Sequence, residues 1–280
     1  MRIAIQGGLA SFHDIAARKF FGAEIETVEC ATFRQLCEQL KNQQVDYAVM
    51  AIENSIAGSI LANYTLMKEY NFNIIGEVQL RIEQNLMALP GVKLKDIKRV
   101  MSHYMALMQC EEFLLSQPQM LEREEYYDTA DSAKYIKEHQ IKDTAAIASG
   151  YAAELYGLDI VAASIETVKQ NFTRFMVLTN DKKHKVEGTT KATLSFQLPD
   201  RVGALADVLK VIVDNKINLT KIQSIPILGK PSEYTFYVDC EWQNYEDFKK
   251  SIVINSIVID LQILGEYKKG ELIYDYTSSK

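Results

Sequence analysis

Residues 170–175 place a hydroxyl and a fixed cation side by side at the start of a β-rich run. Thr173 and Arg174 precede the apolar residues 176–178, and this composition favours a strand. At the mouth of a strand, a hydroxyl donor and a guanidinium could together meet an anionic substrate. An Arg in such a place is also commonly a surface ion-pair partner, so this interpretation depends on what the rest of the chain supplies.

Three other loops each end a predicted strand and begin a predicted helix, at residues 7–11, 53–59 and 102–103. In open α/β sheets, ligands gather at the carboxyl ends of strands. Helix N-termini there offer free backbone N–H groups and a partial positive charge, which suits a carboxylate or a phosphate. Helix capping alone also accounts for Ser11 and Ser59, so both interpretations stay open.

Ser102 and Gln109 are neutral hydrogen-bonding groups that a short helix would bring to one strand end. A helix cap and a surface amide explain them equally well, and Asn54 equally suits a left-handed turn. The sequence has no triad spacing, Walker loop, paired carboxylates or GxGxxG element. Any chemistry must therefore use hydrogen bonds and positioned charge, on a substrate that supplies its own driving force.

The composition is that of an ordinary soluble protein of 280 residues, with 48% hydrophobic and 24% charged residues. A net charge of −6 argues against a nucleic-acid surface. We find no signal peptide or membrane span in the sequence and expect a cytoplasmic protein. The four cysteines form no CxxC pair and the four histidines no ligand pattern. We therefore expect reduced thiols, no metal and no cofactor.

Strands alternate with helices as far as residue 162, which predicts an α/β domain with largely parallel strands. Examples are strand 2–6 before helix 11–21 and strand 45–52 before helix 60–70. A polar linker follows, and the later order of elements is βαββαβ, the ferredoxin-like plan. We expect one domain over residues 1–180, a linker over 181–190 and a second domain over 191–280.

Four motifs follow one another in the order typical of prephenate dehydratases, and the chain resembles that family over nearly its whole length. The motifs are Gly7-Gly8-Leu9-Ala10-Ser11-Phe12, Glu53-Asn54-Ser55 with Gly58-Ser59, Ser102-His103 with Gln109-Cys110, and Asn171-Phe172-Thr173-Arg174-Phe175. The resemblance implies a catalytic domain of two α/β lobes, similar to a periplasmic binding protein, with a C-terminal ACT domain. It also implies conversion of prephenate into phenylpyruvate, carbon dioxide and water.

By these motifs, the implied catalytic residues are Asn54, Ser102, Gln109, Thr173 and Arg174. We also expect Ser11, Ser55 and Phe175 to bind substrate. Loss of carbon dioxide and water makes the substrate ring aromatic, so the enzyme need only hold the dianion and help the hydroxyl to leave. We expect Thr173 to donate a hydrogen bond to that hydroxyl, because a neutral Thr is a poor general acid.

The ACT-like segment implies that phenylalanine binds at a subunit interface of a homodimer or homotetramer and lowers activity. The implied effector-binding residues are Gly203, Ala204, Leu205, Asn218, Leu219, Gln223 and Ser224. Residues 223–226 read Gln-Ser-Ile-Pro where the family usually has Glu-Ser-Arg-Pro, so we expect weaker or altered inhibition. Two alternatives remain: an arogenate dehydratase, whose substrate carries an amino group in place of the keto group, and a non-catalytic amino-acid sensor.

Overall fold

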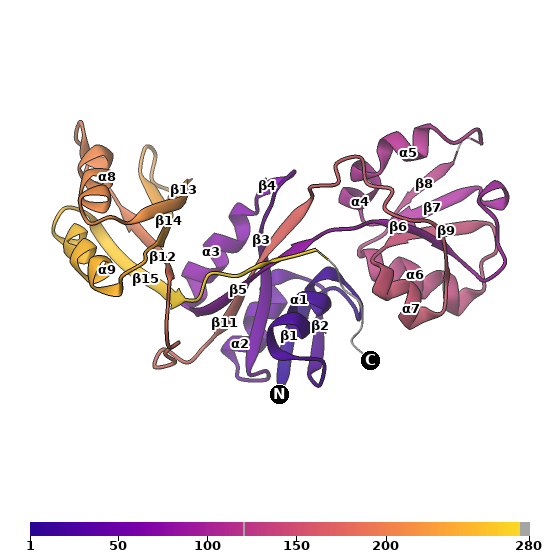
Figure 1. Cartoon of the computed structure of the whole chain (residues 1–280), viewed down its shortest axis with the longest axis horizontal. Coiled ribbons are helices and arrows are strands. Elements are labelled where there is room, and N and C mark those ends of the chain that lie inside the picture. The colour runs from indigo at the N-terminus through magenta and orange to yellow at the C-terminus, as the bar shows by residue number, and fades with distance from the viewer. Residues whose placement is uncertain (120, 275–280) are drawn as a thin grey trace. The chain divides into compact units, whose positions relative to one another are not determined.

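The computed structural model describes residues 1–119 and 121–274, which contain three β-sheets with helices packed against them (Figure 1). The chain forms two compact units. The first unit comprises Met1–Leu66, Val78–Phe175 and the segment that begins at Glu271, and the second comprises Met67–Glu77 and Met176–Gly270. We refer to residues 1–66 as the first lobe and residues 85–162 as the second lobe, both of which belong to the first unit.

The first sheet has the strand order β16-β5-β11-β3-β1-β2, with β4 beside β3. Its strands are β1 (Arg2–Gln6), β2 (Glu26–Cys30), β3 (Tyr47–Asn54), β4 (Gly58–Ser59), β5 (Asn73–Arg81), β11 (Phe172–Thr179) and β16 (Leu272–Ile273). The helices α1 (Phe12–Phe21), α2 (Phe33–Lys41) and α3 (Leu61–Tyr70) follow β1, β2 and β4 along the chain. Strand β1 pairs in parallel with β2 and β3. The predicted cap is confirmed, because the Ser11 hydroxyl accepts the Asp14 amide at 3.3 Å.

The second sheet has the order β10-β6-β9-β7-β8. Its strands are β6 (Asn85–Ala88), β7 (Arg99–Ser102), β8 (Glu122–Glu125), β9 (Thr144–Ala148) and β10 (Asp159–Ala162). Strand β7 pairs in parallel with β8 and β9, but β6 pairs antiparallel with both β9 and β10. The expectation of largely parallel strands is therefore wrong for this sheet, because β6 follows β5 directly through residues 82–84, without the helical crossover that joins parallel strands.

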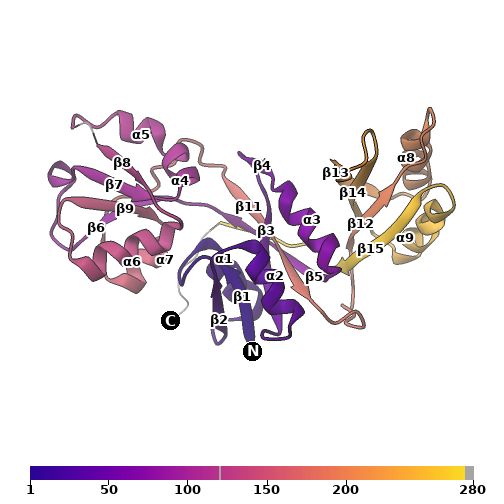
Figure 2. The ribbon, with the colours of Figure 1, turned by 180° about the vertical axis from the view of Figure 1, so that it is seen from behind.

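Helices cover both faces of the second sheet (Figures 1 and 2). They are α4 (Tyr104–Gln109), α5 (Glu111–Leu115), α6 (Thr129–His139) and α7 (Gly150–Tyr156), with a 3-10 turn η1 at Leu94–Asp96. Alternate strand residues point to opposite faces, so Met87 and Ala146 pack with α6 and α7, whereas Leu86 and Ala145 pack with α4 and α5. Two short helices, α4 and α5, thus follow β7 along the chain, and α6 is an element that the sequence patterns did not reveal.

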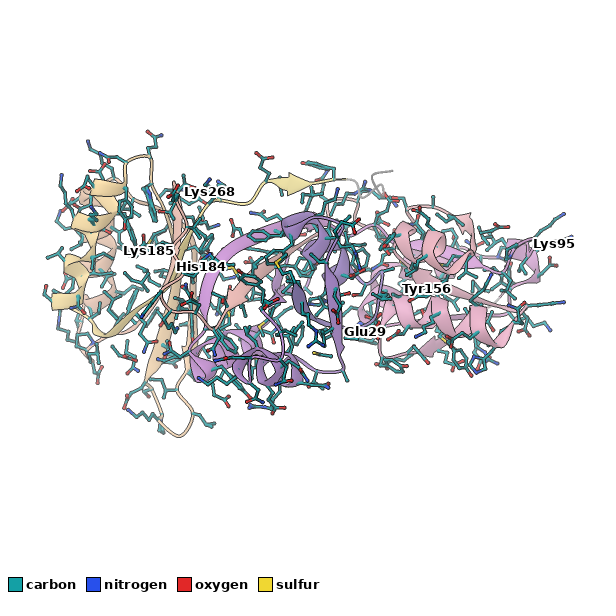
Figure 3. The ribbon with its side chains drawn as sticks, turned by 90° about the horizontal axis from the view of Figure 1, so that it is seen from below. Glu29, Lys95, Tyr156, His184, Lys185 and Lys268 are labelled. Carbon is teal, nitrogen blue, oxygen red and sulfur yellow. The ribbon has the colours of Figure 1, made fainter. Side chains whose placement is uncertain are left out.

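The loop between β1 and α1 contacts both lobes. The hydroxyl of Tyr156 donates to the Leu9 carbonyl at 3.1 Å, and the Leu9 amide donates to Glu29 at 3.1 Å. Figure 3 labels these two side chains, which come from α7 and β2. Ser149 adds a bond of 2.8 Å from its hydroxyl to the Ala10 carbonyl. This loop is therefore held on two sides by side chains far apart in the sequence.

The second unit contains a four-stranded antiparallel sheet of order β13-β14-β12-β15. Its elements are β12 (Lys191–Gln197), α8 (Ala204–Asp214), β13 (Asn218–Pro226), β14 (Tyr234–Glu241), α9 (Tyr245–Ser251), η2 (Ile252–Ser256) and β15 (Ile259–Tyr267). The order confirms the expected βαββαβ plan, and its core includes Phe196, Val208 and Trp242. Within the described ranges, we find no helix with the length and apolar character that crossing a membrane requires.

Candidate active site

A pocket of about 360 Å³ lies in the first unit and is lined by residues of both lobes and of β11. Five of the residues predicted from the motifs line it, namely Ser11, Asn54, Gln109, Thr173 and Phe175. They come from α1 and its cap, β3, α4 and β11, which lie far apart in the sequence. The folded chain thus brings polar side chains from all four segments considered above to a single cavity, since His103 of the loop 102–103 also lines it.

Thr173 and Asn54 form the centre of the polar lining. The amide nitrogen Nδ2 of Asn54 donates to Thr173 Oγ1 at 3.0 Å, and each residue is only 9% exposed. The other amide atom of Asn54, Oδ1, accepts the backbone N–H groups of Ile56 and Ala57 at 3.0 and 2.9 Å. These two bonds fix which end of the amide faces Thr173, since a carboxamide oxygen cannot donate. The hydroxyl of Thr173 can then donate its own proton to a third group.

A chain of amide side chains extends from this centre toward the second lobe. Asn54 Nδ2 also donates to Asn171 Oδ1 at 2.7 Å, and Asn171 Nδ2 donates to Gln109 Oε1 at 3.0 Å. Gln84 adds a longer donation to the same oxygen, at 3.4 Å. Asn171 is fully buried, so its two hydrogen bonds are shielded from water. They fix the position of the Gln109 side chain relative to Thr173. Asn171 belongs to the fourth sequence motif, and only the fold shows that it links Asn54 to Gln109.

Three of the predicted residues lie outside the lining. Arg174 stands between Thr173 and Phe175 on β11, so strand alternation turns it to the opposite face, where it lies 3.9 Å from Glu53. Ser102 is fully buried and donates to the Ile147 carbonyl at 2.6 Å. The structure therefore places Arg174 and Ser102 outside the described pocket lining, on strands that flank it.

Ser55 is the third of these residues, and it joins two segments of backbone. Its hydroxyl accepts the Phe172 amide at 2.9 Å and donates to the Gln170 carbonyl at 3.1 Å. Both bonds tie the end of β3 to the start of β11. The hydroxyl therefore positions the strand that carries Thr173.

Two histidines in the pocket were not singled out by the sequence patterns. The His13 ring packs edge-on against Phe175, with ring centroids 4.9 Å apart, and its Nε2 accepts the Ala51 amide at 3.2 Å. Burial lowers the pKa of His13 to about 3, so its ring is neutral at physiological pH. His103 accepts the Met105 amide through Nδ1 at 3.2 Å, and burial also lowers its pKa. A neutral His103 therefore carries its proton on Nε2.

Asp128 is the carboxylate of the pocket lining, and the sequence analysis missed it. It caps α6, because Oδ1 accepts the amides of Ala130 and Asp131 at 2.8 and 3.2 Å. Burial, together with the nearby negative charge of Asp131, raises the pKa of Asp128 to about 6. An Asp followed by a helical segment is a recognisable cap signal, but only the fold shows that this cap faces the pocket.

Comparison with known proteins identifies the family. Residues 3–183 match the family model described as prephenate dehydratase. The chain belongs to the prephenate dehydratase family. The match spans more than half of the chain and includes every member of the amide network, so this family member is a dehydratase. Residues 192–241 match the ACT domain model, which confirms the expected C-terminal domain.

Individual relatives agree with the family match. An arogenate dehydratase/prephenate dehydratase of Arabidopsis thaliana is 37% identical over 281 residues, covering 95% of this chain and 72% of the relative. A solved prephenate dehydratase from Arthrobacter aurescens, in complex with L-Phe, has a TM-score of 0.85 and 26% identity, covering 96% of this chain and 90% of that chain. A quorum quenching acylase of a novel type gives a TM-score of 0.85 and 28% identity, covering 96% and 98%. The two-lobed α/β fold with an ACT domain is thereby confirmed.

Proposed function

We propose that this dehydratase converts prephenate into phenylpyruvate, carbon dioxide and water. The observation that carries the proposal is the bond from Asn54 to Thr173 Oγ1, which leaves the Thr173 O–H group as a donor on the pocket wall. A hydroxyl donor at that place suits a substrate whose leaving group is itself a hydroxyl. No Lys and no Cys is among the described residues that line the pocket, so the lining offers neither an amine nor a thiol as a nucleophile.

The proposed reaction breaks two bonds and makes the ring aromatic. The bond between the ring and its carboxylate breaks, and its electron pair enters the ring while carbon dioxide departs. The C–O bond opposite breaks with its electron pair on oxygen, and this hydroxide takes a proton to become water. Thr173 stabilises the negative charge that develops on that oxygen by donating a hydrogen bond.

The remaining residues take orienting roles in this proposal. Gln109 and Asn54 hold the polar side of the pocket, and Phe175 with His13 forms an apolar wall for the ring. Ser11 contributes the capped start of α1, where backbone N–H groups favour a carboxylate. Arg174, Ser102 and Ser55 act indirectly, by holding the strands that carry the lining.

Turnover of purified protein with prephenate tests the proposal. Phenylpyruvate is followed as its enolate in alkali, with a Thr173→Ala variant as the matched control for background decay. Product formed by the wild type and strongly reduced in the variant supports the assignment. If the wild type forms no product from prephenate or from arogenate, the non-catalytic sensor is the better interpretation.

We propose further that phenylalanine binds the ACT domain and lowers activity. Gly203, Ala204 and Leu205 line a hollow of about 320 Å³ at the start of α8, where the φ of Gly203 is +83°. The other expected effector residues, Asn218, Leu219, Gln223 and Ser224, lie on β13. In this proposal β13 of a second subunit completes the site in a homodimer or homotetramer.

Sedimentation and calorimetry with phenylalanine test the effector proposal. We expect an oligomer whose affinity for phenylalanine rises in a Gln223→Glu/Ile225→Arg double variant, because both charges of the usual family motif return. A monomer that binds phenylalanine as tightly as the double variant would contradict the interface.

A further inference from the structure

The electrostatic character of the pocket is unusual for a site that is to hold a dianion. Asp128 is acidic, while both histidines of the lining have lowered pKa values. Within the described residues that line the pocket, none is Lys or Arg. The nearest cation of the motifs, Arg174, is on the opposite face of β11 beside Glu53. The described lining therefore offers a substrate no side chain with a full positive charge.

Asp128 is held rigidly in its place. One oxygen is bound by the amides of Ala130 and Asp131, and the residue is only 9% exposed. The other oxygen faces the β1–α1 loop so closely that a methyl carbon on Gly7 would lie 2.6 Å from it. The chain keeps this glycine at a φ of +88°, and a side chain there would displace the carboxylate. The Asp128 carboxylate therefore lies between the first turn of α6 and the β1–α1 loop, which together fix its position in the pocket wall.

Two substrates of the same skeleton differ in the charge that such a wall would meet. Prephenate carries two carboxylates and a keto group, for a net charge of −2. Arogenate carries an ammonium in place of the keto group, for a net charge of −1. A largely buried carboxylate on the pocket wall repels the first and attracts the ammonium of the second, and the low local dielectric around it strengthens both effects.

We propose that Asp128 binds the ammonium group of arogenate and gives this enzyme a preference for arogenate over prephenate. The inference rests on the dehydratase function proposed above and names the substrate for the same site. The ammonium takes no part in bond breaking, so the elimination is unchanged: carbon dioxide and water leave and the ring becomes aromatic. The product is then phenylalanine, the amino acid that we propose as the ACT effector.

Kinetics with both substrates on three proteins test the inference. We compare the wild type with Asp128→Asn, which keeps an N-cap acceptor but removes the charge. The matched control is Asp131→Asn, which removes a neighbouring acid of the same helix that lies outside the lining. We expect the wild type to favour arogenate in kcat/KM and Asp128→Asn to lower the ratio of arogenate to prephenate by ~10–100-fold, as for loss of a charged hydrogen bond. We expect Asp131→Asn to leave the ratio within about three-fold, as for a charge outside the pocket.

The outcomes separate the two proposals. Turnover of both substrates with a ratio that Asp128→Asn leaves unchanged, or that Asp131→Asn lowers equally, overturns the role of Asp128. A wild type that favours prephenate overturns it as well. A wild type that turns over neither substrate overturns the dehydratase function itself. If Asp128→Asn does not fold, Asp128→Ser, which also caps a helix without charge, is measured in its place.

Discussion

Thr173 and Asn54 meet through a hydrogen bond of 3.0 Å in which the amide is the donor and the hydroxyl oxygen is the acceptor. The direction of this bond follows from the two backbone amides that occupy the oxygen of Asn54. It matters for catalysis because an acceptor role toward Asn54 leaves the Thr173 proton for the substrate. A bond of the opposite direction would consume that proton.

Removal of the Thr173 hydroxyl should slow the chemical step. We expect Thr173→Ala to lower kcat by ~10²–10³-fold with KM within a few fold, as for loss of one transition-state donor. Thr173→Ser keeps the hydroxyl and should retain most of the activity. Steady-state kinetics on the preferred substrate measure both. Equal kcat values for Thr173→Ala and the wild type would remove Thr173 from this role.

Reversal of the bond from Asn54 should also slow catalysis without loss of the fold. In Asn54→Asp, one carboxylate oxygen can still accept the amides of Ile56 and Ala57. The other draws the Thr173 proton to itself and can no longer donate to Asn171 Oδ1. We expect kcat to fall by ~10–10²-fold, as for a misdirected donor. Circular dichroism should be unchanged. An active Asn54→Asp variant would show that the direction of the bond is unimportant.

The buried Asp128 should make stability depend on pH. Its pKa is about 6 in the folded protein against 3.8 for an unperturbed Asp, so the unfolded chain ionises first. The stability contributed by this group therefore falls as pH rises from about 4 to about 6, by about 3 kcal/mol for two units. Asp128→Asn should remove that fall. Urea unfolding of both proteins at pH 4 and pH 7 measures it, and parallel losses in the two proteins would count against the raised pKa.

Two glycines of similar backbone conformation should respond differently to a methyl group. The φ values of Gly7 and Gly22 are +88° and +93°, so Ala is strained at either place. A Cβ at Gly7 meets Asp128, whereas a Cβ at Gly22 meets nothing within 4 Å. We expect Gly7→Ala to cost about 1–3 kcal/mol more in unfolding free energy than Gly22→Ala, from overpacking. Equal costs would mean that the carboxylate can move away freely.

A buried ion pair in the second unit should contribute far more than an exposed one beside it. Lys191 lies 3.1 Å from Glu77 and 3.3 Å from Glu241, and its side chain is 4% exposed. We expect Lys191→Met to cost about 3–5 kcal/mol, because it removes the ammonium group from beside the fully buried carboxylate of Glu77. Lys269 also binds Glu241, at 2.8 Å, but is 56% exposed, so Lys269→Met should cost under about 1 kcal/mol. Urea unfolding of the two variants measures both losses of unfolding free energy. Losses of similar size would contradict the prediction.

Several local features followed from sequence because their causes are local. Ser11 caps α1 as predicted, since a cap depends on residues within one turn. The βαββαβ order followed from short periodic runs. Strand alternation also predicts that Thr173 and Arg174 point to opposite faces of β11, and the structure places only Thr173 in the pocket lining. Residues that are neighbours in a strand are thus not neighbours around the pocket.

The sequence by itself determined the family of the chain and the ferredoxin-like plan of its second domain. It also pointed to Asn54, Gln109 and Thr173 as candidate site residues. These conclusions were possible because motifs, caps and periodicity depend on short stretches of sequence. The tertiary structure alone decided that Asp128 faces the pocket while Ser102 does not. That outcome depends on how α6, the loop at Gly7 and the strands of the second sheet pack together. Such packing joins Gly7 to Asp128 and Ser102 to Ile147, which are far apart in the sequence. Contacts of that kind set the charge of the pocket, and with it the preference for arogenate over prephenate that we propose.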